Sequence, residues 1–516
     1  MTFFHKSGRA PFGMRFTLSA LLLFLLSTTA YYKFYHHHLD LPSGCDEFGY
    51  LQLADRIANG VVFDSQPERA FTPELISFLQ KQGLAYKDYA WLIAPHAYHV
   101  EKTTQKVINQ YPPGTSIVLS FFEKEHRQVM FPAATLFLFA VFPLLACLLL
   151  TGEWNRLLFG VNLVLLFIMT AMVISPFMNE LHRINSVAPT YGMLLAAGIL
   201  MEKRPGMSLF LIGLSVVFRL PNVMIAMPVF GYYLFSNVSQ SSEKVKTLIR
   251  RFFAGAVYFG MSGVALYFLY VFLLLGNPFL PTYSALDQQF VTWQGILHNV
   301  RFYFNPTNQW FMANLLPLIG VLALGIAKKK NRFYLVCLTS VPVINYLFFL
   351  THSLRNGYYP YASGLFLWGT LLYLIWDAFE TRPKRQLIAF SGLVLLLCAT
   401  LINSLNQHDL DHRIALRKQA EPYQQCFGDV DVVWAELHSS SVEYATDAAG
   451  FRYQWGPTKA RRAAMRWLNQ NDYRQAIWVD DLKLSKATIR KEIDSAGLKM
   501  SETRCSQLGT VYRISG

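Results

Sequence analysis

Long apolar runs recur along this chain of 516 residues, and they constrain its fold more than any other feature. An α-helix of about 20 apolar residues crosses the hydrocarbon core of a bilayer. The runs therefore predict a mainly α-helical, polytopic membrane protein with about eleven transmembrane helices. The predicted spans lie near residues 15–34, 129–150, 157–178, 187–201, 207–219, 220–236, 252–275, 310–327, 333–350, 361–379 and 386–404.

The charge balance agrees with a membrane protein. Charged side chains make up only 15% of the chain, whereas about a quarter is usual in soluble proteins. The formal net charge of +14 would be compatible with nucleic-acid binding if the basic residues formed one surface. They gather instead in short turns between apolar runs, as topology signals do. We therefore exclude nucleic acid as a partner.

The same basic turns predict the orientation of the chain. If the spans alternate, these turns fall on one side, which the positive-inside rule assigns to the cytoplasm. The carboxyl end then lies outside the cytoplasmic (inner) membrane of the cell. Residues 15–34 could also be a cleaved signal peptide, but the aromatic residues that follow favour an uncleaved helix. The basic segments are Lys6 to Arg15, Lys203-Arg204, Lys244 to Arg251, Lys328 to Arg332 and Arg382 to Arg385.

Two long polar segments are predicted to lie outside the membrane. Residues 36–128 form an outer loop with short helices from Glu47 and from Thr72, and they belong to a transmembrane domain of residues 1–404. Residues 405–516 alternate between strand-like and helical patterns, which predicts a small extracytoplasmic α/β domain. Cys426 and Cys505 lie in this domain, where an oxidising compartment would permit a disulfide. The sequence leaves their pairing open.

An acidic pair, Asp46-Glu47, follows the first predicted span at the outer mouth of the membrane domain. Carboxylates near hydrocarbon are costly and often mark a functional site. A carboxylate within hydrogen-bond reach of a hydroxyl group can act as a general base. Asp46 can equally cap the helix that begins at Glu47, and a cap would also fix the position of its carboxylate.

Cationic residues at the outer ends of several other spans form a second group. Arginine holds phosphate oxygens in a bidentate manner, so arginines that converge there could bind a lipid phosphate. The alternative is that each side chain simply reaches toward lipid headgroups. We expect these cations and the acidic pair to share one aqueous pocket. The cationic residues are His182, Arg183, Arg219, Arg301 and Arg355.

Metal binding receives little support. Adjacent histidines, such as His36 to His38, rarely supply the convergent geometry that a metal needs. We therefore predict no metal ligands and keep a divalent cation only as an option. A stiff Tyr111-Pro112-Pro113-Gly114 turn precedes the second span, and physical reasoning alone favours a simple return into the bilayer there.

The order and sidedness of these motifs resemble the GT-C glycosyltransferases, most closely the protein-mannosyltransferase and aminoarabinose-transferase branch. The resemblance covers roughly residues 15–380. Gly49 departs from it, because relatives often carry a bulkier residue there. The motifs are Gly44 to Leu51, Tyr111 to Gly114, His182 to Pro189, Arg219 to Asn222, Gly276 to Tyr283 and Arg355 to Pro360.

The resemblance implies an inverting hexosyl- or pentosyltransferase that uses a polyprenyl-phosphate-linked sugar. It implies Asp46 as the catalytic base, with Glu47 assisting, and a lipid, glycan or protein as the acceptor. His182, Arg183, Arg219 and Arg355 would contact the donor phosphate. Further candidate substrate-binding residues are Tyr50, Tyr111, Tyr283, Arg301 and Tyr358.

Two other classes of function stay open at this stage. A secondary transporter or lipid flippase would place ionisable groups near the middle of the membrane, often on interrupted helices. Arg219, between two short apolar runs, is the residue that fits this alternative best. A non-catalytic assembly protein whose outer domain binds a partner is the third possibility.

Overall fold

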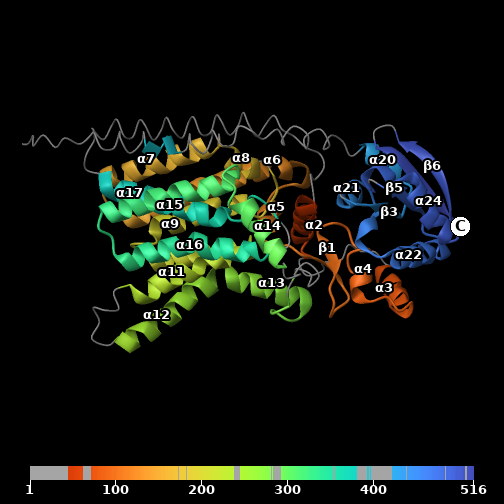
Figure 1. Cartoon of the computed structure of the whole chain (residues 1–516), viewed down its shortest axis with the longest axis horizontal. Helices are drawn as coiled ribbons and strands as arrows, with labels where there is room; N and C mark the ends of the chain where they lie inside the picture. The colour runs from red at the N-terminus through yellow and green to blue at the C-terminus, as the bar shows by residue number, and fades with distance from the viewer. Residues whose placement is uncertain are drawn as a thin grey trace, which may run out of the picture. The chain divides into compact units, whose positions relative to one another are not determined.

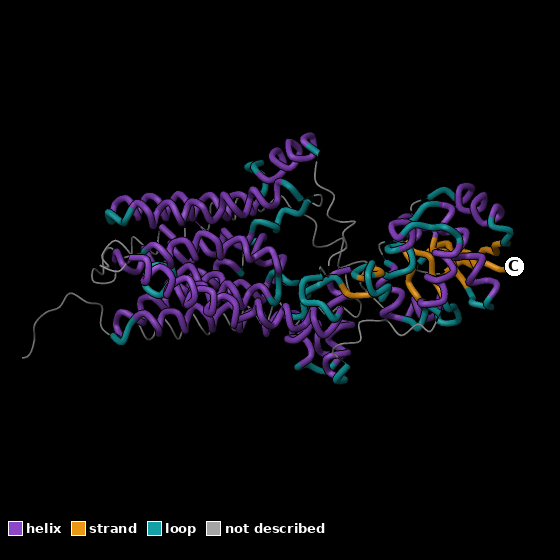
Figure 2. The backbone as a smooth tube through the Cα atoms, turned by 90° about the horizontal axis from the view of Figure 1, so that it is seen from below, coloured by secondary structure: helices purple, strands orange, loops and turns teal. Residues whose placement is uncertain are grey.

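The structure is a computed structural model of the chain, and it is mostly helical (Figures 1 and 2). The chain divides into two compact units. The first holds the described parts of 129–268 and 288–407, and the second those of 38–128, 269–287 and 408–516. The described residues are 45–61, 71–172, 174–181, 183–236, 244–280, 282, 292–352, 355–379, 392–393, 395–396, 421–436, 438–482, 484–505 and 508–516.

The first unit is a bundle of apolar helices. Five helical segments of the described chain are long and apolar enough to cross a membrane: 124–150, 244–275, 309–327, 332–350 and 361–379. The predicted polytopic helical fold is confirmed, although the number of eleven spans is not. The span predicted at 15–34 and most of the one at 386–404 lie outside the described residues. Four shorter apolar helices cover 156–171, 188–200, 205–216 and 220–235.

The helices of this bundle follow the apolar runs closely. Helix α12 is the main difference, because the basic segment Lys244 to Arg251, expected to be a turn, forms its first two turns. Lysine and arginine are good helix formers, and the segment has no glycine or proline to end a helix. The elements are α6 Arg127–Leu150, α7 Trp154–Ala171, α8 Ser175–Leu181, η2 Ala188–Thr190, α9 Tyr191–Leu200, α10 Pro205–Val216, η3 Leu220–Asn222, α11 Val223–Phe235, α12 Lys244–Phe259, the π-helix η5 Gly260–Val264, α13 Ala265–Leu275, α14 Trp293–Tyr303, α15 Gln309–Ala327, α16 Arg332–Leu350 and α17 Tyr361–Phe379. Helix α13 belongs to this unit only as far as Phe268.

Helix α17 lies at the centre of the bundle and is buried from Tyr361 to Trp376. It packs against α9 and α15. Glycines allow this close approach, because a Cβ on Gly198 would collide with the carbonyl oxygen of Phe366 and one on Gly369 with that of Leu195. Small residues at such crossings are typical of membrane helices, which associate largely through close packing.

The second unit contains the strands that Figure 2 shows in orange. Its outer-loop part comprises α2 Cys45–Ala58, α3 Thr72–Lys81, α4 Tyr86–Tyr89, the antiparallel pair β1 Tyr98–Val100 and β2 Val107–Asn109, α5 Gly114–Ser120 and η1 Lys124–His126. Its carboxyl-terminal part comprises α20 Glu421–Phe427, β3 Val432–Ala435, α21 Ser439–Ala445, β4 Ala449–Arg452, η6 Tyr453–Trp455, α22 Thr458–Gln470, β5 Gln475–Trp478, α23 Val479–Leu482, α24 Lys486–Ser495, β6 Lys499–Cys505 and β7 Gly509–Ser515.

The carboxyl-terminal sheet has the strand order β4-β3-β5-β7-β6. Strands β4, β3 and β5 are parallel, with Val432 opposite Ala449 on one side and Gln475 on the other. Strands β7 and β6 join antiparallel as a hairpin. Alternating strands and helices therefore form the small α/β region that the sequence pattern predicted. The predicted domain boundary near residue 404 lies outside the described residues.

A buried arginine joins the outer loop to this sheet. Arg452, at the end of β4, is 1% exposed. Its Nε donates to the carbonyl groups of Trp91 and Ala94 at 3.1 Å each, and its Nη2 donates to that of Tyr98 at 2.7 Å. The backbone N–H of Arg452 also donates to Leu92. These hydrogen bonds hold residues 91–98 against the edge strand β4, which lies more than 350 positions further along the chain.

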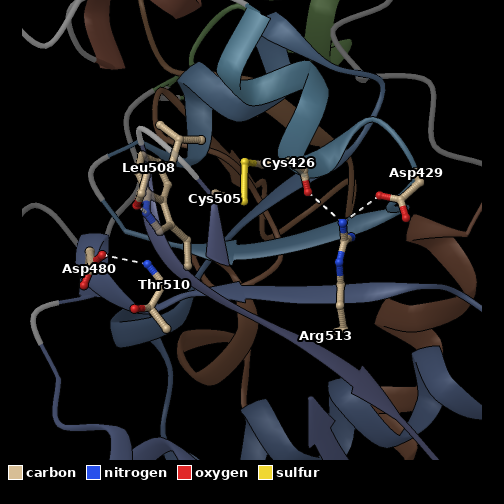
Figure 3. The surroundings of a disulfide bond; sticks show 8 residues. Cys426, Asp429, Asp480, Cys505, Leu508, Thr510 and Arg513 are labelled. Carbon is tan, nitrogen blue, oxygen red and sulfur yellow. Dashed lines mark hydrogen bonds and ion pairs between the residues drawn. A yellow bond between two sulfur atoms is a disulfide. The ribbon is translucent and has the colours of Figure 1, made fainter. Parts of the chain in front are cut away.

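Cys426 and Cys505 form a disulfide, which links α20 to the end of β6 (Figure 3). Arg513 on β7 donates to the Cys426 carbonyl and to the Asp429 carboxylate, at 2.7 Å each. The Trp478 indole donates to the Leu508 carbonyl at 2.8 Å. The bridge and these bonds hold the β6–β7 hairpin against α20 and β5.

Candidate functional site

The acidic pair lies in the first turn of α2, where the helix dipole favours negative charge. The Asp46 side chain is half-buried, and Glu47 is 6% exposed. The Tyr111 hydroxyl donates to Asp46 Oδ1 at 2.6 Å and accepts from Gln110 Nε2 at 3.1 Å. The structure therefore brings two predicted site residues, Asp46 and Tyr111, into direct contact.

Hydrogen bonds hold the segment around Tyr111 against α2. Asn109 donates from its amide to the Gly49 carbonyl at 2.7 Å and accepts from the Tyr111 N–H at 2.9 Å. Ser116 donates to the Tyr50 carbonyl at 3.0 Å. A chain of bonds of this kind fixes the direction from which the Tyr111 hydroxyl approaches the carboxylate.

Close packing explains why the chain has a glycine at position 49, where it departs from the motif that it otherwise resembles. A Cβ on this glycine would lie 2.8 Å from both Tyr111 Cδ2 and Ala97 Cβ. The absent side chain therefore makes room for the ring that bonds Asp46. Tyr50, a predicted substrate-binding residue, is 1% exposed and packs against Tyr111 with ring centroids 5.0 Å apart.

Asp46, Glu47, Gln110 and Tyr111 form what is here called the acidic cluster, and the predicted Gly276–Tyr283 motif also contacts it. Thr282 donates from its hydroxyl to the Gln110 carbonyl at 3.1 Å. Tyr283 itself lies outside the described residues. The Tyr111-Pro112-Pro113-Gly114 motif ends in the short helix α5, so it is a turn that also positions the partner of Asp46.

A second cluster, here called the arginine cluster, is built around Arg219 in the bundle. Its backbone is extended, with φ −149° and ψ 107°, where the chain passes from α10 to η3. Its Nη1 donates to the Ser186 hydroxyl at 3.2 Å. Its guanidinium lies over the rings of Tyr358, Tyr359 and Tyr361, at 5.3, 5.2 and 5.7 Å from their centroids. Three motifs widely separated in sequence therefore meet at one guanidinium group.

The loop that carries Ser186 is shaped by Asn185. Its amide donates to the Glu180 carbonyl at 2.7 Å and to the Glu180 carboxylate at 3.3 Å. Its side-chain oxygen accepts the N–H groups of Val187 and Ala188, at 2.8 Å each. Arg183, on the same loop, is half-buried, and His182 lies outside the described residues.

The loop that carries the tyrosines is held at its far end by polar groups on three helices. The Pro360 carbonyl accepts from Asn314 on α15 at 3.3 Å, from Asn345 on α16 at 3.2 Å and from Ser363 on α17 at 2.9 Å. Buried polar networks that are satisfied in this way rigidify the backbone that they hold. Tyr358 and Tyr359 therefore project from a fixed loop.

Arg355 and Arg301 lie in different surroundings. Arg355 is exposed and donates from Nε to Asn299 Oδ1 at 2.7 Å, while the Asn299 amide donates to the carbonyl groups of Leu350 and His352. Burial, followed by the positive charge of Arg219, lowers the pKa of His352, which places it within electrostatic reach of the arginine cluster. Arg301 is exposed in the last turn of α14, where a cation complements the helix terminus.

Sequence reasoning missed one of the three tyrosines that contact Arg219 in the arginine cluster. Tyr361 is fully buried, and its hydroxyl shares a hydrogen bond with Thr190 at 2.7 Å and donates to Asn222 at 3.1 Å. Glu180, Asn185 and Asn299 were not singled out as site residues either. All of them are polar residues within or beside apolar runs, and that is the signal that could have identified them.

The acidic cluster belongs to the second unit and the arginine cluster to the first, so a common pocket stays a prediction. Among the described residues, no group of three or more histidine, cysteine, aspartate or glutamate side chains could hold a metal ion. The groups that can take part in chemistry are the half-buried Asp46 carboxylate beside the Tyr111 phenol, and the Arg219 guanidinium, which contacts three tyrosine rings.

Comparison with known proteins bears on the fold. No protein-family model and no curated protein matches the sequence. The structure is similar to the crystal structure of ArnT from Cupriavidus metallidurans bound to undecaprenyl phosphate, with a TM-score of 0.52 and 12% sequence identity over 98% of this chain and 100% of that chain. The apo state of ArnT matches with a TM-score of 0.49 and 10% identity over 98% and 99%. ArnT is an aminoarabinose transferase of the GT-C class, so the predicted resemblance is confirmed at the level of the fold.

Proposed function

We propose that this chain is an integral membrane glycosyltransferase of the GT-C type. It moves a sugar from a polyprenyl-phosphate-linked donor to a lipid, glycan or protein acceptor on the extracytoplasmic face of the cytoplasmic membrane. The observation that carries the proposal is the meeting of the Ser186, Arg219 and Tyr358 motifs around one guanidinium. The fold shared with a protein that was crystallised with undecaprenyl phosphate supports it.

In this reaction the arginine cluster binds the donor phosphate. Arg219, Arg355, Arg183 and His182 supply donors to its oxygens, while Tyr358 is available to the sugar. The acceptor hydroxyl attacks the anomeric carbon from the face opposite the phosphate, its proton passes to Asp46, and the anomeric C–O bond breaks. The products are polyprenyl phosphate and a glycoside of inverted configuration.

The setting of Arg219 suits the charge that develops during this step. Negative charge grows on the leaving phosphate as its bond to the sugar breaks. A cation that is already oriented by Ser186 and by aromatic rings stabilises that charge without having to reorganise. Such preorganised electrostatic stabilisation is often the largest contribution to catalysis.

A secondary transporter or lipid flippase is the second candidate. Arg219 lies between the short helices α10 and α11, and interrupted helices carry the substrate sites of many transporters. The two functions differ in their products, because a transporter moves its substrate without forming a covalent bond. The assay must therefore measure bond formation.

The proposed function is tested by comparing envelope lipids and glycans from cells with and without the gene by mass spectrometry. We expect one hexose, pentose or uronic acid residue to disappear from one class of envelope molecule. Purified protein in detergent, where no membrane separates two compartments, should restore that residue from a polyprenyl-phosphate sugar. An unchanged envelope, or a detergent-solubilised protein that forms no glycosidic bond, would contradict the proposal.

The disulfide gives a separate prediction about the stability of the second unit. Closing a loop of 79 residues stabilises a fold by about 4–5 kcal/mol in the chain-entropy treatment. Cys426→Ser and Cys505→Ser should each lower the thermal midpoint of the second unit, and the double variant should cost no more than either one. Scanning calorimetry or thermal-shift measurements check this result.

The location itself is read out by thiol labelling of whole cells. A membrane-impermeant maleimide should label these two cysteines only after mild reduction, and the double serine variant should lose that signal. Labelling without reductant would show that the pair is reduced, whereas no labelling of whole cells either before or after reduction would argue for a cytoplasmic domain. Cys147 and Cys337, both buried in the bundle, are internal controls in the denatured protein.

A further inference from the structure

The carboxyl ends of the three parallel strands β3, β4 and β5 lie together at one edge of the sheet in the second unit. Glu436 follows β3, Trp455 follows β4 and Asp481 follows β5. Helix α21, after β3, packs with α20 and α2, whereas α22, after β4, packs with α24 and α3. The chain passes from β3 to β4 on one side of β3 and then to β5 on the other side, so the strand order reverses between β3 and β5. In open α/β sheets, ligands bind outside the carboxyl ends of the strands at such a point.

Trp455 lies at this edge with its ring held in place. Its indole is 41% exposed, although it contacts the Arg452 guanidinium at 5.0 Å and the Trp91 ring at 5.5 Å. His96 meets it edge-on at 6.2 Å. The Glu436 carboxylate accepts hydrogen bonds from Trp455 and from the Gln454 N–H. A large aromatic surface is therefore both exposed and fixed in orientation, which lowers the entropic cost of binding to it.

A carboxylate–imidazole pair is linked to the tryptophan through Glu436, whose carboxylate bonds to Trp455 and whose backbone N–H bonds to Asp481. Asp481 Oδ1 and His438 Nδ1 are 2.6 Å apart, and Asp481 Oδ2 accepts the N–H groups of Glu436 and His438. Burial opposes ionisation of Asp481, but these hydrogen bonds outweigh it and hold the pKa of the carboxyl below its usual value. The carboxylate holds the imidazole through Nδ1, so Nε2 is the ring nitrogen that can bond to a ligand. The His438 side chain is 30% exposed.

We propose that Trp455, His438 and Glu436 form a binding site for a sugar ring of the acceptor glycan. The C–H face of a pyranose packs on an indole, and its hydroxyl groups bond to imidazole and carboxylate groups. Arg452 contacts Trp455 but is buried and donates to three backbone carbonyl groups, so its charge is not offered to a ligand. The acidic character of the edge therefore favours a neutral or amino sugar over a phosphate.

The site is tested by saturation-transfer NMR on the full chain in nanodiscs, without donor. The probes are the methyl glycosides of glucose, galactose, mannose and glucosamine, with inorganic phosphate as the competing anion. At least one glycoside should bind, phosphate should not displace it, and Trp455→Ala and His438→Gln should each weaken binding at least tenfold. Tyr473→Ala is the matched control, since Tyr473 is a half-buried aromatic residue just before β5, at the opposite edge of the sheet.

The outcomes separate this site from the proposed function on which it rests. Failure of all four glycosides to bind, displacement by phosphate, or unchanged binding in folded Trp455→Ala would overturn the inference. A melting curve of each variant shows whether it is folded, and His438→Gln keeps the test valid if Trp455→Ala is not. Asp46→Asn should bind the glycoside like the wild type. Sugar binding by a protein that transfers no sugar would remove the proposed function and leave this site standing.

Discussion

Replacement of Asp46 by asparagine should lower sugar transfer by about 10²–10⁴-fold, the usual range for loss of a general base. Asparagine has almost the same shape and can still accept the Tyr111 hydrogen bond that the structure shows at 2.6 Å. It cannot take the proton of the acceptor hydroxyl, so the chemical step should slow while the fold is kept. Single-turnover rates with a polyprenyl-phosphate sugar measure that step directly.

Three companion variants make this result specific. Tyr111→Phe removes the hydroxyl that orients the carboxylate and should cost about tenfold, the equivalent of about 1.4 kcal/mol. Glu47→Gln tests the assisting role of the neighbouring acid. Glu74→Gln, at an exposed acid in the first turn of α3, should have no effect. Wild-type turnover by a folded Asp46→Asn variant would end the assignment of Asp46 as base.

Local sequence patterns predicted the elements on which these assignments rest. The helix predicted to begin at Glu47 and the alternation of strands and helices predicted in residues 405–516 both rest on a clear hydrophobic period or turn signals, and both are present among the described residues. The predicted motif loops at Ser186, Arg219 and Tyr358 also meet. Glycine, proline and polar residues between apolar runs identified these loops because such residues are costly inside a span.

Other features depend on contacts that no local pattern contains. Arg452 holds residues 91–98 on the sheet, and nothing near Arg452 in sequence indicates that partner. Tyr361 is one aromatic residue within an apolar run until Thr190 and Asn222 are brought to its hydroxyl. No local pattern explains the glycine at position 49 either, because the side chain that leaves no room for a Cβ there is Tyr111, 62 positions away.

The second large effect is expected at Arg219, whose replacement by glutamine should raise the apparent KM for the donor by about 10–100-fold. A hydrogen bond to a charged group contributes about 1.5–3 kcal/mol, and each 1.4 kcal/mol is about tenfold in affinity. Arg219→Lys should fall between the wild type and Arg219→Gln, because lysine keeps the charge but cannot bind phosphate in a bidentate manner. Initial rates over a range of donor concentrations give the KM.

Binding of the product gives a second measure that does not depend on chemistry. Polyprenyl phosphate carries the phosphate and lipid but no sugar, so it should raise the thermal midpoint of the wild type more than that of Arg219→Gln. Ser186→Ala should have a smaller effect in the same direction, since it removes the 3.2 Å bond that orients Arg219 but leaves its charge. Asp46→Asn should bind this product normally.

The matched control for charge is Arg332→Gln, because Arg332 is an exposed arginine in the first turn of α16. Arg301→Gln tests the prediction that Arg301, which is exposed in the last turn of α14, binds substrate: a rise in donor KM like that of Arg219→Gln would place Arg301 at the phosphate. Loss of the contacts between Arg219 and the three tyrosine rings can itself destabilise the bundle, by about 0.5–1 kcal/mol for a pair at an exposed site and by about 2 kcal/mol for a desolvated pair. Melting curves without ligand separate that cost from lost binding. If folded Arg219→Gln keeps the wild-type donor KM and the same shift with polyprenyl phosphate, Arg219 is a packing residue and the phosphate is held elsewhere.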